Sequence, residues 1–109
     1  MKVNNAIIAI DYGTKKSGLA YSVESFAFAY RTIPTRELLT TLWALIEAKS
    51  VSQIIIGMPY NIDGTISTHG RRVRSYVDIL RKHISLPITY IDERLTTSEA
   101  TLGFEAVGI

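Results

Sequence analysis

Apolar residues in the first third of the chain predict three strands in succession. The first strand covers residues 6–11, where an apolar run meets the acidic Asp11. The second covers residues 18–23 and the third covers residues 26–32. Because short polar, turn-forming links separate these runs, we expect them to pair as an antiparallel meander.

The spacing of apolar residues then changes and predicts helices alternating with strands. After Pro34, a leucine-rich segment has helical spacing, and we expect Thr35 to cap this helix and Lys49 to lie near its end. Residues 53–57 form a continuous apolar run, as expected of a strand that pairs in parallel with the first. A second helix is predicted over residues 68–83, a fifth strand over 88–93, and a final helix from a capping box at 96–99.

This order of elements predicts an α/β fold. We expect one domain over residues 1–109, with a mixed five-stranded sheet, a three-strand antiparallel meander followed by parallel strands, and flanking helices. With 109 residues and 47% hydrophobic content, the chain is long and apolar enough for a globular core. It has no apolar run near the roughly 20 residues of a membrane span, so we expect a cytoplasmic protein with no membrane association.

Composition narrows the candidate chemistry. The chain has no cysteine, which excludes disulfides, thiolate nucleophiles and cysteine-based zinc sites. His69 and His83 are isolated in sequence and have no helical partner that would make either a convincing metal ligand. A net charge of +2 is too small to indicate a polyanionic partner, so the placement of the charges matters more than their sum.

Two carboxylates at predicted strand ends carry the functional signal. Asp11 ends the first strand, and Glu93 follows Asp92 at the end of the fifth. A partly buried carboxylate is costly unless it is paired, hydrogen-bonded or bound to metal, so two at neighbouring strand ends indicate a cation site. Strand alternation places Asp92 and Glu93 on opposite faces, and we favour Glu93 with Asp92 as the second choice. Asp11 could instead only cap the Gly13 turn, and Glu93 could form only a surface ion pair with Arg94.

Three segments resemble the signature blocks of one family. Asp11–Ala20, Ile56–Thr65 and Asp92–Ala100 are similar, in order and spacing, to the blocks of the YqgF family, also called RuvX or Holliday junction resolvase-like proteins. The resemblance implies a ribonuclease H-like fold and a nuclease that matures the small-subunit ribosomal RNA precursor or resolves branched DNA. Family members continue beyond residues 104–108 through a loop and a further helix with another metal-binding aspartate, which a chain ending at Ile109 is expected to lack.

The resemblance implies a metal-dependent phosphodiesterase. Phosphodiester hydrolysis needs charge neutralisation at the phosphate and an activated water, which divalent cations supply. Asp11 and Glu93 are suitable oxygen ligands for Mg²⁺ or Mn²⁺, and Asp92 completes the candidate catalytic set. With two metal-binding carboxylates instead of the family's fuller set, we expect the 109-residue chain to fold but to cleave poorly.

Several basic and loop residues are candidates for binding nucleic acid. Lys15 and Lys16 lie at a predicted hairpin tip beside Asp11, although a turn can also hold lysines for solubility alone. The other basic candidates are Arg71, Arg72, Arg74 and Arg94. On the second helix, Asp78 favours instead a solvated face in which it pairs with Arg74 and Lys82. The candidate residues of the cleft loops are Gly13, Thr14, Asn61 and Asp63.

Two other functional classes are consistent with the sequence. A catalytically silent nucleic-acid-binding or interaction module would share the fold and lack activity. The turn at residues 11–14 is also similar to the phosphate-binding hairpin of sugar kinases and actin-like ATPases. Those enzymes close two domains around a nucleotide and 109 residues supply one, so that interpretation ranks last. The sequence leaves open RNA or DNA as substrate and a monomer or a dimer as the assembly.

Overall fold

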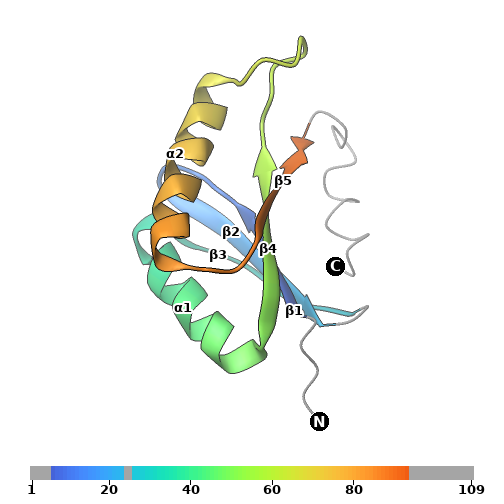
Figure 1. Cartoon of the computed structure of the whole chain (residues 1–109), viewed down its shortest axis with the longest axis vertical. Coiled ribbons are helices and arrows are strands. Elements are labelled where there is room, and N and C mark those ends of the chain that lie inside the picture. The colour runs from blue at the N-terminus through green and yellow to red at the C-terminus, as the bar shows by residue number, and fades with distance from the viewer. Residues whose placement is uncertain (1–5, 24–25, 94–109) are drawn as a thin grey trace.

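The computed structural model describes residues 6–23 and 26–93 (Figure 1). In chain order, the elements are β1 (Ala6–Asp11), β2 (Lys16–Val23), β3 (Phe26–Pro34), the short 3₁₀ helix η1 (Thr35–Glu37), α1 (Leu38–Lys49), β4 (Val51–Met58), α2 (Thr68–His83) and β5 (Ile88–Asp92). The expected strands and the first two expected helices are confirmed, with ends that differ by a few residues at most. The final helix expected from residue 96 lies outside the described residues.

The strands form one mixed sheet in the order β3-β2-β1-β4-β5. β1, β2 and β3 pair as the expected antiparallel meander, and β4 pairs in parallel with both β1 and β5. The expected α/β class and sheet composition are therefore confirmed. β4 lies between β1 and β5, so the expectation that Asp11 and Glu93 end adjacent strands is wrong.

Helices α1 and α2 pack on the same face of this sheet, which we call the helix face (Figure 1). The core lies beneath them and joins alternate residues of the central strands to the apolar stripes of both helices. Its fully buried side chains include Ile8, Ile10, Leu38, Leu42, Ile54, Ile56, Val73, Val77 and Leu80. The residues that alternate with these core positions along the strands, such as Ala9, Asp11 and Gly57, belong to the opposite face of the sheet, which we call the second face. Neither of these helices, nor any other described part of the chain, has the length and apolar character of a membrane-spanning helix.

The start of α1 differs from the sequence expectation. Thr35 does not cap α1, because η1 intervenes and the residue preceding α1 is Glu37, whose side chain makes no capping hydrogen bond. The Thr35 hydroxyl instead donates to the carbonyl oxygen of Gly13 at 2.6 Å. The physical reason is competition: a hydroxyl that bonds the turn after β1 is no longer available to the helix terminus. Thr35 thereby connects the end of β3 to the turn that follows Asp11.

Candidate active site

The turn after β1 is held rigidly by side-chain hydrogen bonds. Gly13 N–H donates to Ser17 Oγ at 3.2 Å, and Ser17 Oγ lies 2.7 Å from Thr35 Oγ1. Gly13 is required here, since a Cβ at this position would overlap the carbonyl oxygen of Lys16. The Gly13 N–H is thus satisfied by Ser17, and no turn hydrogen bond to Asp11 occurs within the described residues, so the interpretation of Asp11 as only a turn cap is wrong.

Gly57 on β4 is the residue that allows the two candidate carboxylates to approach each other. The parallel register pairs Ile10 with Ile56, so Asp11 lies beside Gly57 one residue further along. Neighbouring strands are about 4.8 Å apart. A Cβ on Gly57 would lie 2.8 Å from Cδ of Glu93 and would overlap its Oε2, so the Glu93 carboxylate occupies the space that a side chain on β4 would fill. Asp11, Gly57 and Glu93 therefore meet on the second face.

The charge of Asp11 acts on the Glu93 carboxylate. The pKa of Glu93 is raised above its ordinary value, first because partial burial desolvates its charge and second because the negative charge of Asp11 repels it. His69 acts in the opposite direction and lowers the pKa of Glu93. A cation bound at this pair would relieve the repulsion that Asp11 exerts on the Glu93 carboxylate.

His69 is a member of this site that the sequence analysis missed. It lies in the first turn of α2, where Ser67 caps the helix by accepting a hydrogen bond from Gly70 N–H at 2.9 Å. His69 Nε2 lies 2.9 Å from the carbonyl oxygen of Tyr12, so one ring nitrogen is hydrogen-bonded to the residue that follows Asp11. The signal is absent from local sequence because its partner is 57 positions away.

The donor set fits a divalent cation with two protein ligands. No group of three or more His, Asp or Glu side chains close enough to hold a metal occurs within residues 6–23 and 26–93. The carboxylates of Asp11 and Glu93 are hard oxygen donors, and Mg²⁺ and Mn²⁺ are commonly bound by one or two carboxylates plus water and phosphate oxygens. A cation here would therefore complete its coordination with oxygens from outside this pair.

A sequence comparison identifies the lineage of this fold and site. The profile of the family described as "RuvX: Holliday junction resolvase" matches residues 5–109, which is nearly the whole chain. The chain belongs to the RuvX family. The match covers β1, β4 and β5, the three strands that bring Asp11, Gly57 and Glu93 together.

Curated relatives of this RuvX-family chain carry one name, "Putative pre-16S rRNA nuclease". The protein of that name from Rickettsia typhi is 37% identical over 111 residues, which cover 97% of this chain and 71% of the relative. Its namesake from Maridesulfovibrio salexigens is 35% identical over 108 residues, 94% of this chain and 80% of the relative. Among solved structures, YeaZ from Pseudomonas aeruginosa has a TM-score of 0.50 at 19% identity, over 88% of this chain and 50% of that one, and shows similarity of fold alone.

Asp92 lies on the other side of the sheet from the carboxylate pair. It pairs with Met58 at the end of β4, and Met58 is buried against α2 on the helix face. Adjacent residues of paired strands project to the same face, so Asp92 belongs to the helix face while Glu93 contacts Gly57 on the second face. The preference for Glu93 over Asp92 thus agrees with this geometry, and any role of Asp92 would be exerted from the helix face.

The basic residues expected to bind nucleic acid occupy two places in the RuvX-family fold. Lys15 and Lys16 are exposed at the turn between β1 and β2, and Arg71, Arg72 and Arg74 are exposed on α2. The expected pairing of Asp78 with Arg74 and Lys82 is wrong, because the salt bridge found within residues 6–23 and 26–93 joins Arg36 to Glu37 at 4.0 Å. Exposed pairs of this kind gain little over solvation, so their absence costs the fold little. Arg94 lies outside the described residues.

The loop after β4 is shaped by its own polar side chains. Asp63 Oδ1 accepts hydrogen bonds from the backbone N–H and the hydroxyl of Thr65, at 2.9 and 2.7 Å, and Asn61 Nδ2 donates to the Thr65 hydroxyl at 2.9 Å. The loop projects beyond the end of β4, at the top of the view in Figure 1. These contacts agree with the expectation that Asn61 and Asp63 shape this loop. Thr14 is exposed in the other loop, directly after Gly13.

Proposed function

We propose that this chain is a metal-dependent nuclease that hydrolyses phosphodiester bonds in the precursor of the small-subunit ribosomal RNA. The observation that carries the proposal is the meeting of Asp11 and Glu93 across Gly57 on one face of the sheet. Membership of the RuvX family and the name carried by its curated relatives support the reaction class and the substrate.

Asp11 and Glu93 would hold Mg²⁺ or Mn²⁺ through their carboxylate oxygens. When bound, the metal neutralises charge at the scissile phosphate and lowers the pKa of the attacking water. The residues of the chain contribute position: the Ser17 and Thr35 hydrogen bonds fix the turn after Asp11, and Gly57 leaves room for the Glu93 carboxylate. His69 holds the backbone at Tyr12 and contributes a favourable interaction to Glu93.

Branched DNA is the second candidate substrate, because the matching family profile is described as a Holliday junction resolvase. Both substrates present phosphodiesters that the same carboxylate pair would serve, and they differ in shape and in the 2′-hydroxyl. A silent nucleic-acid-binding module of the same fold is the third reading, and it predicts binding without cleavage.

The test compares cleavage of two labelled substrates by the 109-residue chain. A 16S precursor fragment and a four-way DNA junction are incubated with Mg²⁺, with Mn²⁺ and with EDTA. We expect metal-dependent cleavage of the RNA that Asp11→Asn abolishes. Preferential cleavage of the junction would identify branched DNA as the substrate in place of the RNA precursor. Binding without cleavage in either metal would establish the silent module.

A second measurement tests the metal site without relying on activity. Mn²⁺ that binds the folded state raises the melting temperature in proportion to the logarithm of its concentration over the dissociation constant. We expect this stabilisation in the wild-type chain and its loss in both Asp11→Asn and Glu93→Gln. Equal stabilisation of all three proteins would place any bound metal elsewhere.

A further inference from the structure

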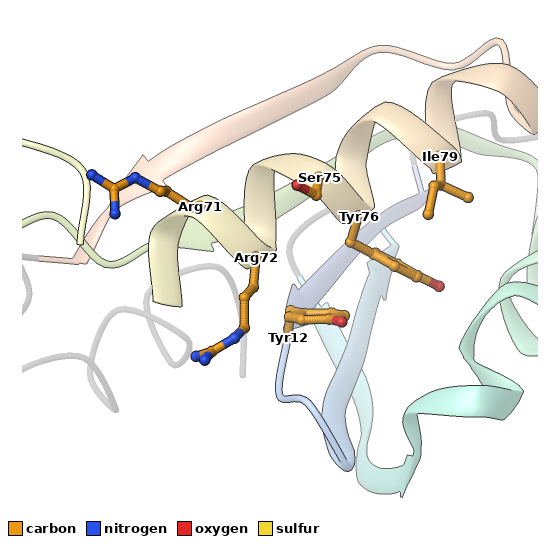
Figure 2. A pocket seen from close by; sticks show the side chains of 6 residues that line it. All are labelled: Tyr12, Arg71, Arg72, Ser75, Tyr76 and Ile79. Carbon is orange, nitrogen blue, oxygen red and sulfur yellow. The ribbon is translucent and has the colours of Figure 1, made fainter. Parts of the chain in front are cut away.

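A shallow pocket of about 330 Å³ lies against α2, beside the end of β1 (Figure 2). Its size is at the lower end of the range for small-molecule sites. The lining residues are Tyr12, Arg71, Arg72, Ser75, Tyr76 and Ile79. All except Tyr12 come from α2, and Tyr12 comes from the segment that leaves β1 directly after Asp11.

The aromatic wall of this pocket consists of two stacked tyrosines. The rings of Tyr12 and Tyr76 have centroids 4.8 Å apart and an interplanar angle of 30°. Figure 2 shows both rings, with the Tyr76 side chain extending from α2 toward Tyr12. Both residues are only half-buried, so each keeps accessible surface in the pocket. The Tyr12 ring also stacks on His69 at 6.0 Å, which fixes its orientation from the side of the candidate active site.

The other walls supply positive charge and an apolar end. The Arg71 and Arg72 side chains are exposed, and neither takes part in an ion pair within residues 6–23 and 26–93. In Figure 2, the Arg72 side chain extends beside the Tyr12 ring, while Ile79 lies at the far end of the pocket. Ile79 is 47% exposed, a large fraction for an isoleucine, and burial of such a side chain by a ligand is favourable.

Aromatic faces combined with unpaired guanidinium groups match the chemistry of a nucleotide. A base stacks on tyrosine whatever its sequence, because every base has a π-face. Arginine donates paired N–H groups to phosphate oxygens with a geometry that lysine does not reproduce. A base meets a neutral phenol on Tyr76 at physiological pH, because tyrosine ionises only near pH 10. Burial, with a second contribution from Tyr12, raises the pKa of Tyr76 further, to about 12.

We propose that this pocket is a subsite for one unpaired nucleotide of the substrate strand, with the base on the Tyr12–Tyr76 wall and a flanking phosphate on Arg72, whose side chain lies beside the Tyr12 ring in Figure 2. The position of Tyr12 carries the assignment, because Tyr12 follows Asp11 directly: a strand seated against its ring on the helix face reaches Asp11, on the second face, by passing around the end of β1. The inference rests on the proposed nuclease function and adds that the substrate must present a single-stranded nucleotide a short way along the strand from the scissile bond.

A binding assay in EDTA tests the subsite without cleavage. The probes are a short single-stranded RNA carrying 2-aminopurine, the same strand with an abasic site at that position, and the fully paired duplex. We expect the wild-type chain to quench 2-aminopurine fluorescence and to bind the base-bearing strand about 5-fold to 150-fold more tightly than the abasic one, from stacking alone. The duplex should show no quenching, because its bases remain stacked on one another.

Variants on α2 provide matched controls. Tyr76→Leu should abolish the preference for the base-bearing strand, while Tyr76→Phe, which keeps the ring, should retain it and guard against a folding defect. Arg72→Gln should weaken binding more than Arg74→Gln, since Arg74 is exposed on the same helix but does not line the pocket.

Two results would overturn the subsite. Equal affinity of the wild-type chain for base-bearing and abasic strands would exclude stacking, and equal effects of Arg72→Gln and Arg74→Gln would show diffuse electrostatic attraction. Failure of the nuclease proposal is distinguishable: stacking without cleavage in Mg²⁺ or Mn²⁺ would refute the activity and keep the subsite, whereas cleavage without stacking would do the reverse.

Discussion

Replacement of Gly57 by alanine should slow cleavage strongly and leave the fold intact. The added Cβ would lie 2.8 Å from Cδ and 3.1 Å from Cγ of Glu93. Carbon atoms in contact are normally about 3.5–4.0 Å apart, so the Glu93 carboxylate must move by roughly 1 Å. A displacement of that size at a reacting centre costs about 10²-fold in rate. We therefore expect Gly57→Ala to cleave about 100-fold more slowly than the wild-type chain.

The same substitution should change stability very little. Among the described glycines, positive φ occurs at Gly64 and not at Gly57, so the β4 backbone accepts alanine without strain. Alanine in a strand gains roughly 0.5–1 kcal/mol over glycine, and a displaced Glu93 rotamer costs a similar amount, about 0.5–1.5 kcal/mol. The two effects offset, and we expect the melting temperature to change by no more than about 4–8 °C, the equivalent of about 1 kcal/mol.

The assay combines single-turnover cleavage of a 16S precursor fragment with a thermal melt followed by circular dichroism. Glu93→Gln serves as the matched control, and the double variant tests the mechanism. If Gly57→Ala acts only by displacing Glu93, adding it to Glu93→Gln should produce little further loss, because both changes remove the same interaction. Wild-type cleavage by folded Gly57→Ala, or fully additive losses in the double variant, would refute this reasoning.

Three further predictions concern pH, the turn and salt. The pKa of the Glu93 carboxyl is raised in the folded state, so protonated Glu93 favours folding at low pH, and this stabilisation is lost as the pH rises through the pKa of the folded state. In EDTA, the Glu93→Gln variant should therefore have a higher melting temperature than the wild type at pH 7 and the same melting temperature at pH 4. Ser17 is 1% exposed and forms hydrogen bonds with both Gly13 and Thr35, so Ser17→Ala should lower the free energy of unfolding by about 1–3 kcal/mol. An unchanged midpoint of urea unfolding would contradict this. The affinity for nucleic acid should fall as the salt concentration rises. For each single-strand phosphate neutralised, log K should decrease by about 0.7 per tenfold rise in salt concentration. An affinity that does not change with salt would count against electrostatic binding.

The sequence predicted most of the fold because its signals are local. Polar turns between β-rich runs indicated the meander, and the continuous apolar run at 53–57 indicated a strand that pairs in parallel with the first. The cap at Thr35 was wrong because a hydroxyl 22 positions from Gly13 bonds that turn instead. The position of β4 between β1 and β5 was missed for the same reason. Strand order depends on pairing between segments that are distant in sequence, which no local pattern encodes.

For the candidate site, residue type was predictable and assembly was not. Carboxylates at the ends of apolar runs identified Asp11 and Glu93, but no local pattern marked Gly57 as the residue that leaves room for Glu93. His69 was set aside as isolated, although it contacts Tyr12 and interacts with Glu93 in three dimensions. The pocket formed by Tyr12 with α2 was invisible for the same reason, since its aromatic pair spans 64 positions of sequence.

The strand order also sets when the carboxylate pair can exist during synthesis. Asp11 leaves the ribosome 82 residues before Glu93. Glu93 follows β5, which pairs with β4 within the part of the chain that the structure describes. N-terminal segments fold first as a chain emerges, so β1, β2 and β3 can pair long before β5 docks. A nascent chain therefore carries Asp11 without its partner until β5 has emerged and paired with β4. An incomplete copy released beside ribosomal RNA would hold half of the site and none of its chemistry.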